Sequence, residues 1–147
     1  MIGLPVEDPI GDALDTIKLI KKSSPNCSVS CSPLMLYPGT DLHDWCHEQH
    51  IPMNTEIDLE WHKGLGSIRF DENTTRKLKN IKKLCPMFIK YDVDDHWMKA
   101  MIELDMPDEA SRKLSECHYF DSIKFRHKTM GWDVFESTIL QSMDFQY

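Results

Sequence analysis

In the first third of the chain, the spacing of apolar residues changes from a strand pattern to a helical pattern and back to a strand pattern. Residues 1–5 place two apolar positions before Gly and Pro, a pattern typical of a strand that ends in a loop. Residues 27–32 alternate apolar and small polar side chains, which predicts a second strand. Between them, Asp8 and Pro9 form a helix-start signal, and apolar residues follow at helical spacing. This order predicts a βαβ unit with a parallel sheet, and therefore an α/β fold.

From residue 40 onward the spacing is helical. Thr40 is expected to cap a helix over residues 41–49. The inward side chains of this helix are expected to be Leu42, Trp45 and Cys46. Residues 51–70 hold Pro, Asn and Gly without a sustained period, which predicts a long loop.

Further helices are expected after this loop. Asp71 caps the next helix, which is expected to end before Pro86 because proline lacks the N–H that an interior helical position donates. Asp94 caps another helix, and two more are expected from Pro107 and over 132–143. The expected division of the chain is 1–50 for the β/α units, 51–70 for the loop and 71–147 for a C-terminal helical extension.

Composition narrows the classes of function. The chain has 147 residues, of which 41% are hydrophobic and 28% charged, as in a globular domain rather than a disordered chain. Its longest apolar run, residues 34–37, is too short for a membrane span or a signal-peptide core. The net charge of −7 disfavours binding to nucleic acid. Five cysteines, an odd number without a secretory leader, favour reduced thiols and a cytoplasmic location.

Two groups of residues have the chemistry of metal ligands. Cys27 and Cys31 have the spacing that opens an iron–sulfur motif, but Leu34 stands at the third ligand position and cannot bind iron. A role as small buried residues of a strand explains these cysteines better. The second group lies at the helical spacings i, i+3, i+4 and i+7: His43, Cys46, His47 and His50. Two of them could bind zinc with help from elsewhere, but an exposed polar face is the better explanation because one helix rarely supplies a complete site.

Two other patterns have simple structural explanations. Gly64 and Gly66 lack the third glycine and the following helix of a phosphate-binding loop, so a turn is expected there. The basic residues between 76 and 83 are expected to form a solvated helix face. No catalytic residue and no metal ligand is therefore predicted in this chain.

Several segments nevertheless resemble one enzyme family. Four stretches are similar to stretches of that family: Ile2-Gly-Leu-Pro-x-Glu7, DALDTIKLI at residues 12–20, Tyr37-Pro-Gly-Thr-Asp-Leu-x-Asp-Trp-Cys46, and residues 64–91, which resemble its post-barrel helices. The family is the radical S-adenosylmethionine enzymes that carry an N-terminal cobalamin-binding domain, and the similarity covers about residues 1–104. The chain departs from the family pattern at Val6, where the family has glycine, and at Leu36, where it has proline.

The resemblance implies a fold and a set of cofactor contacts. Residues 1–5 and 27–34 would be the fifth and sixth strands of a partial (β/α)6 TIM-like barrel, followed by an α-helical tail. The ends of these strands lie near S-adenosylmethionine in that family. The implied cofactor-binding residues are Gly3, Leu4, Pro5, Glu7, Ser32, Leu34 and Met35.

The resemblance also implies an activity for the complete enzyme. That enzyme would cleave S-adenosylmethionine reductively with a [4Fe–4S] cluster and would use cobalamin in methylation or related radical chemistry. The CxxxCxxC cluster motif would precede Met1. This chain alone is therefore expected to bind no cofactor, to be inactive, and to need an N-terminal radical S-adenosylmethionine half or an upstream domain as its partner.

A non-enzymatic hypothesis stays open beside this one. The chain could be a small α/β-helical protein-interaction module that presents a groove to another protein. Its acidic charge would then favour a basic partner surface. Neither hypothesis involves nucleic acid or a membrane.

Overall fold

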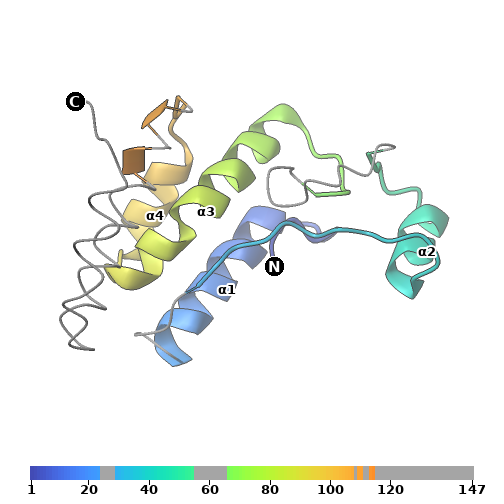
Figure 1. Cartoon of the computed structure of the whole chain (residues 1–147), viewed down its shortest axis with the longest axis horizontal. Coiled ribbons are helices and arrows are strands. Elements are labelled where there is room, and N and C mark those ends of the chain that lie inside the picture. Colours follow the sequence, from blue (N-terminus) through green and yellow to red (C-terminus); the bar gives the residue numbers. More distant parts are fainter. Residues whose placement is uncertain (24–28, 55–65, 108, 111–112, 115–147) are drawn as a thin grey trace, which may run out of the picture. The chain divides into compact units, whose positions relative to one another are not determined.

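The computed structural model describes residues 1–23, 29–54, 66–107, 109–110 and 113–114. Within these ranges the helices are α1 (Pro9–Ser23), α2 (Asp41–Glu48), α3 (Glu72–Lys90) and α4 (Asp95–Ile102) (Figure 1). Helix α1 packs against α3, and α3 packs against α4. Residues 1–107 form one compact unit and residues 108–147 a second.

The predicted α/β fold is wrong, because the described residues form helices and no sheet. The segments predicted as two strands meet only at one isolated parallel bridge, between Ile2 and Pro33. The Ile2 amide donates to the Ser32 carbonyl at 3.0 Å, and the Leu34 amide donates to the Ile2 carbonyl at 2.9 Å. The only other bridge among the described residues is antiparallel and joins residues 53 and 68.

The local hydrogen bonds explain why this pairing does not extend into a strand. A parallel ladder would continue with the Leu4 amide donating to the Leu34 carbonyl. That carbonyl instead accepts from the Ser67 amide at 2.9 Å. Gly3, with φ of 72°, also turns the chain out of the extended conformation directly after Ile2. The predicted βαβ remnant of a TIM-like barrel is therefore not formed.

Helix α1 begins where the sequence predicts it. The Asp8 carboxylate accepts from the Gly11 amide at 2.9 Å and so satisfies one of the unpaired N–H groups of the first turn. The predicted apolar face is buried at Ala13, Leu14 and Ile17. These three side chains belong to the same core as the buried face of α3.

Helix α3 continues through Pro86, where the sequence predicts its end. A proline inside a helix removes one hydrogen bond and costs about 3 kcal/mol. The apolar face, however, continues beyond it with the buried side chains of Phe88 and Ile89. Burying two such side chains contributes roughly 1.5–3 kcal/mol each, which is enough to offset the proline.

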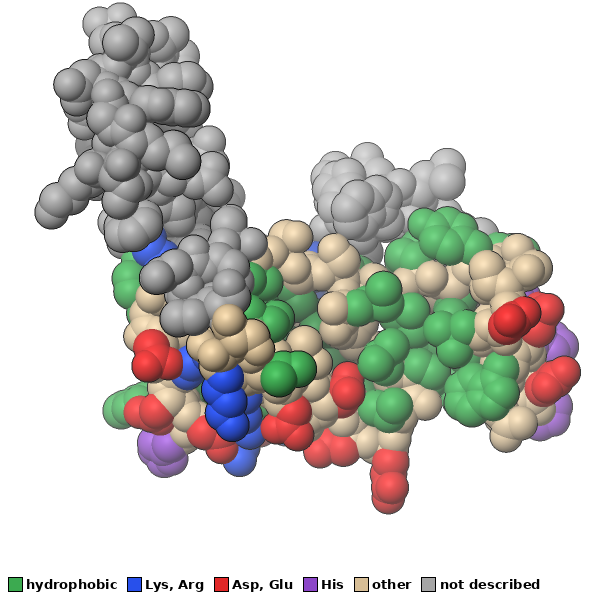
Figure 2. Space-filling model, turned by 90° about the horizontal axis from the view of Figure 1, so that it is seen from below, with side chains coloured by type: hydrophobic (Ala, Val, Ile, Leu, Met, Phe, Trp, Pro, Cys, Tyr) green, Lys and Arg blue, Asp and Glu red, His purple; other side chains and the backbone are tan. Residues whose placement is uncertain are grey.

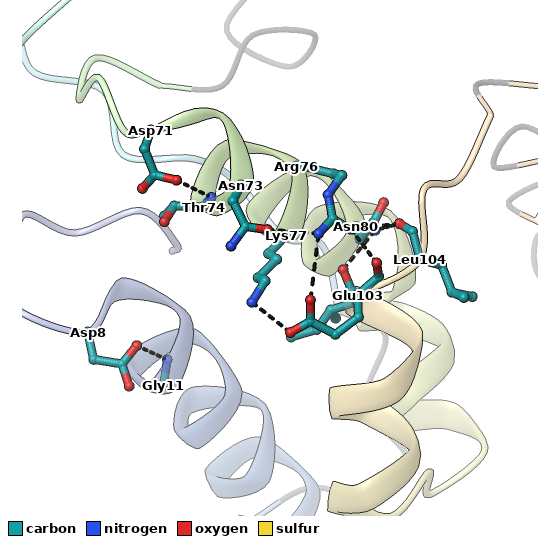
Figure 3. A network of polar contacts seen from close by, with 11 residues as sticks. Asp8, Gly11, Asp71, Asn73, Thr74, Arg76, Lys77, Asn80, Glu103 and Leu104 are labelled. Carbon is teal, nitrogen blue, oxygen red and sulfur yellow. Dashed lines mark hydrogen bonds and ion pairs between the residues drawn. The ribbon is translucent and has the colours of Figure 1, made fainter.

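Polar side chains of α3 close the C-terminal end of α4 (Figure 3). Asn80 is only 3% exposed, and its Nδ2 donates to the carbonyls of Ile102 and Leu104 at 3.0 and 2.8 Å. Arg76 donates to the carbonyls of Glu103 and Leu104. These donors satisfy carbonyl groups that the end of a helix leaves without an intrahelical partner.

The buried side chains form two clusters. The larger cluster, here the helical core, joins α1, α3 and α4: Ile2, Ala13, Leu14, Ile17, Leu78, Ile81, Leu84, Cys85, Phe88, Ile89, Met98 and Ile102. The smaller cluster, here the loop core, consists of Leu34, Leu36, Cys46 and Ile68, with Leu4, Ile51 and Met53 packed against it. The half-buried side chain of Phe70 packs against both clusters.

Little of the second unit is described. Residues 109–110 and 113–114 have helical backbone, and the Lys113 ammonium lies 3.2 Å from the Glu109 carboxylate. The helix predicted over 132–143 lies outside the described residues. Within the described ranges, no helix combines the length and the apolar character that a bilayer crossing requires.

Candidate functional site

The candidate site lies where three segments distant in sequence meet: 2–5, 32–36 and 66–70. The bridge between Ile2 and Pro33 joins the first two segments through backbone hydrogen bonds. The third segment joins them through Ser67, which bonds to the second segment. This meeting point brings together predicted cofactor-binding residues from two parts of the chain.

Ser67 holds the meeting point together. Its amide donates to the Leu34 carbonyl at 2.9 Å, and its hydroxyl accepts from the Leu36 amide at 2.8 Å. Its own carbonyl accepts from the Asn54 amide at 2.8 Å. Leu36 stands where the resembled family has proline, and proline could not donate this hydrogen bond. Three backbone or hydroxyl groups of one buried serine therefore fix the position of two loops.

Gly66 allows the backbone to come close at this point. Its φ of 91° belongs to the left-handed region, and a Cβ atom placed on it would lie 2.5 Å from the Leu34 carbonyl oxygen. Glycine is the residue that accepts both conditions. The turn that the sequence predicts over Gly64 and Gly66 falls mostly outside the described residues, which include Gly66 but not Gly64.

The seven residues that the resemblance implies as cofactor contacts have different environments. Gly3 is buried and follows the bridge residue, and Leu4 packs against the loop core that contains Leu34. Ser32 is half-buried, and its carbonyl accepts from the Ile2 amide. Gly3, Leu4, Ser32 and Leu34 are therefore brought together. Pro5 and Met35 are half-buried neighbours of this group in sequence, and Glu7 is exposed.

Burial limits what these residues could contribute to a ligand. Leu34 is 4% exposed inside the loop core, and its amide and carbonyl are already hydrogen-bonded to Ile2 and Ser67, so it supports the site rather than contacting a ligand. Leu4, Ser32 and Met35 retain exposed surface, two of them apolar and one with a hydroxyl group. Such a mixture of apolar contacts and a few polar groups is typical of small-molecule sites.

The second group of candidate ligands, on α2, is divided by burial. Cys46 is fully buried in the loop core, and this burial raises the pKa of its thiol. His47 and His50 are exposed, and His43 Nδ1 lies 3.0 Å from the Asp44 carboxylate. Across the described part of the chain, no three His, Cys, Asp or Glu side chains are grouped to hold a metal ion.

The prediction that α2 carries Leu42 and Trp45 inward is wrong. These side chains are 40% and 43% exposed, and Cys46 is the only residue of α2 that is buried. Among the helices that the structure describes, none packs against α2 as closely as α1 packs against α3 or α3 against α4. Two large apolar side chains of this helix are therefore left facing solvent.

A pair of cysteines is brought together elsewhere in the first unit. Cys31, half-buried in the extended segment before Ser32, is hydrogen-bonded to Cys85, which is buried on α3. That hydrogen bond lowers the pKa of the Cys31 thiol, and the positive charges of the Met1 amino group and Lys82 act in the same direction against partial burial. Cys27, predicted together with Cys31 from the sequence spacing, lies outside the described residues.

Sequence reasoning missed both Ser67 and the Cys31–Cys85 pair. Nothing near Ser67 marks it as a junction except the adjacent Gly66, which signals a turn but not its partner. The position of Cys85 on the apolar face of α3 was recognisable from helical spacing, whereas its contact with Cys31 depends on tertiary packing.

Comparison with known proteins does not assign the chain to a family. No protein-family model matches the chain, and no curated protein and no solved structure matches it.

Proposed function

We propose that this chain is the C-terminal part of a cobalamin-dependent radical S-adenosylmethionine enzyme and contributes to holding S-adenosylmethionine. One observation supports the proposal above others. Gly3 and Leu4 meet Ser32 and Leu34 at a hydrogen-bonded junction, although the two segments are separated by the whole of α1. The resemblance assigns these same residues to the cofactor side.

The described residues fit S-adenosylmethionine but not the iron–sulfur cluster. Leu4, Ser32 and Met35 offer apolar contacts and one hydroxyl for the adenosyl and methionyl parts of the cofactor. The 147 residues contain no CxxxCxxC motif, and Leu34 is buried where a third cysteine would stand. The proposal therefore needs the iron–sulfur cluster and cobalamin to be held by another polypeptide segment, in the cytoplasm.

The role of this chain within such an enzyme is to bind and orient. The [4Fe–4S] cluster, when present, supplies the electron that cleaves S-adenosylmethionine. The Ser32 hydroxyl would hydrogen-bond a polar group of the cofactor, and Leu4 and Met35 would exclude water from its apolar part. The bridge hydrogen bonds hold the backbone at Ile2, Ser32 and Leu34, next to Leu4 and Met35 in the sequence, and so limit how the spacing of these side chains can vary.

Co-expression with the polypeptide encoded immediately upstream at the same locus tests the proposal. We expect a stable complex that contains iron and acid-labile sulfide and binds S-adenosylmethionine in equilibrium dialysis. Ser32→Ala should weaken that binding about tenfold, the equivalent of one hydrogen bond. Leu104→Gln, at a side chain that is 53% exposed and away from the site, serves as the control. Failure to form a complex would refute the proposed function.

A second candidate function, a protein-interaction module, is favoured by the surface of α2. Leu42 and Trp45 are exposed, and the acidic residues Asp41, Asp44 and Glu48 lie on the same short helix. Figure 2 shows apolar side chains gathered at the α2 end of the first unit, with acidic side chains at their border. This arrangement suits a partner helix that has one apolar face bordered by Lys and Arg.

Binding of a designed amphipathic Leu/Lys peptide tests this second function. We expect fluorescence anisotropy to report binding that weakens as salt rises and is lost in Trp45→Ala. Trp97→Ala is the matched control because Trp97 is 59% exposed but lies on α4. Equal binding by both variants, or no binding by the wild-type chain, would exclude this surface as the docking site.

A further inference from the structure

Cys31 and Cys85 lie together although one belongs to an extended segment and the other to a helix. Cys31 is packed against the helical core, of which Cys85 is a member, and a hydrogen bond joins the two thiols. Both are reduced. A disulfide between them would require the two sulfur atoms to approach to the S–S bond length of about 2.05 Å.

The surroundings of the pair favour the thiolate form of Cys31. The thiol of Cys85 donates to it, which lowers the pKa of Cys31. Lys82 lies one helical turn before Cys85 and contributes positive charge, and the Met1 amino group adds more. Partial burial acts in the opposite direction. The thiolate is the form that attacks disulfides, so Cys31 has the character of a nucleophile and Cys85 that of a resolving thiol.

Cys46 offers a comparison within the same chain. It is fully buried in the loop core, and burial raises the pKa of its thiol. It therefore has the properties of an inert structural cysteine. The contrast with Cys31 arises from position alone, because both residues belong to the same compact unit.

We propose that Cys31 and Cys85 form a reactive dithiol site that reacts with low-molecular-weight disulfides and closes into an intramolecular disulfide. The inference is independent of the proposed function. It rests on the hydrogen-bonded contact between two cysteines, on the partial exposure of Cys31 and on the cation of Lys82 beside it.

The reaction proceeds in two exchange steps. The Cys31 thiolate attacks one sulfur of oxidised glutathione, forms a mixed disulfide, and releases one glutathione thiolate that takes up a proton. Cys85 then loses its proton to solvent, its thiolate attacks the Cys31 sulfur, and a second glutathione leaves and is protonated. In sum, two protein thiols are oxidised to one disulfide, and oxidised glutathione is reduced to two glutathione molecules.

The site can be tested on the full wild-type chain with oxidised glutathione as the probe. After acid quenching, we expect the intact mass to fall by two hydrogen atoms and peptide mapping to join residues 31 and 85. Brief labelling of the reduced chain with iodoacetamide should modify Cys31 about tenfold or more faster than Cys46. A disulfide between Cys31 and Cys27, or equal labelling of Cys31 and Cys46, would overturn the proposal.

Variants separate the two steps. Cys85→Ser should stop the reaction at a single glutathione adduct on Cys31, whereas Cys31→Ser should carry neither an adduct nor a disulfide at Cys85. Cys46→Ser is the matched control and should oxidise as the wild type does. Far-ultraviolet circular dichroism checks that each variant retains its helices. An adduct on Cys85 in the Cys31→Ser variant, at the wild-type rate, would show that Cys31 is not the nucleophile.

Discussion

Gly66 combines a left-handed φ with a close backbone neighbour, which the other described glycines do not. An alanine there must adopt a φ of 91°, and its Cβ must avoid the Leu34 carbonyl oxygen at 2.5 Å. We expect Gly66→Ala to lower the free energy of unfolding by about 2–3 kcal/mol, measured by urea denaturation. Gly39 is the matched control, because its φ is 83° but no heavy atom lies within 4 Å of the added Cβ. Gly39→Ala should cost only about 1 kcal/mol. Equal losses would show that the close approach is unimportant.

Asn80 is the polar side chain most deeply buried in the first unit among the described residues. Its two hydrogen bonds satisfy the carbonyls of Ile102 and Leu104 (Figure 3). We expect Asn80→Ala to destabilise the chain by about 2 kcal/mol in thermal or urea unfolding, because these carbonyls lose a donor. Asn73→Ala, at an exposed residue that accepts from Arg76, should change stability by less than about 0.5 kcal/mol. A similar cost for both variants would contradict the role given to Asn80.

At the scale of elements, the sequence predicts where helices begin, but it does not predict where the backbone pairing between the segments 1–5 and 27–34 stops. Asp8, Thr40, Asp71 and Asp94 mark the starts correctly, because a cap acts within three residues of itself. Among the described residues, the pairing of Ile2 with Pro33 stops where the Ser67 amide takes the Leu34 carbonyl, a contact between residues far apart in the sequence. Local patterns do not contain such information.

The candidate site was predictable only in part, for the same reason. The resemblance names Gly3, Leu4, Ser32 and Leu34 as a group, and the structure brings them together. Whether they hold a cofactor stays a prediction. The exposure of Trp45 was not predictable, since helical spacing shows which residues share a face but not whether another element covers that face.

The ion pair between Lys18 on α1 and Asp95 on α4 leads us to expect a stability that depends on pH. The pKa of this carboxyl is lowered by its bonds to Lys99 and to Lys18, which lies on α1. The ionised Asp95 carboxylate stabilises the folded state at pH values above its pKa in the unfolded chain, near 3.8. This stabilisation is lost as the pH falls through the lower pKa of the folded state. We therefore expect the Tm difference between wild type and Asp95→Asn to be constant above about pH 5 and to vanish in stronger acid.

Lys18→Met provides a second test of this ion pair. This variant removes the partner of Asp95 on α1 and leaves Lys99 in place. The Tm difference between wild type and Lys18→Met should therefore depend on pH as it does for Asp95→Asn, but with a smaller amplitude. A Tm difference that persists unchanged below pH 3 would show that the carboxylate charge is not its cause.

At the scale of the whole first unit, the proposed disulfide would change stability. A bond between Cys31 and Cys85 would close a long loop of the unfolded chain and restrict it. We expect the oxidised chain to be more stable than the reduced chain by about 4 kcal/mol, less any strain in the folded state. Urea denaturation with and without dithiothreitol measures the difference. The Cys46→Ser variant should show the same difference in stability between its oxidised and reduced forms. An oxidised chain that is less stable than the reduced chain would show that strain in the folded state exceeds the entropic gain from closing the loop.

The position of Phe70 between the helical core and the loop core has a dynamic consequence. Among the described residues, the two clusters share no buried member, and the half-buried Phe70 packs against both. Segment 33–36 should therefore open without global unfolding, and its amide protons should exchange with deuterium well before those of the α3 interior. Hydrogen-exchange mass spectrometry would record two separate opening free energies. We therefore expect the loop core to have a lower local stability than the helical core.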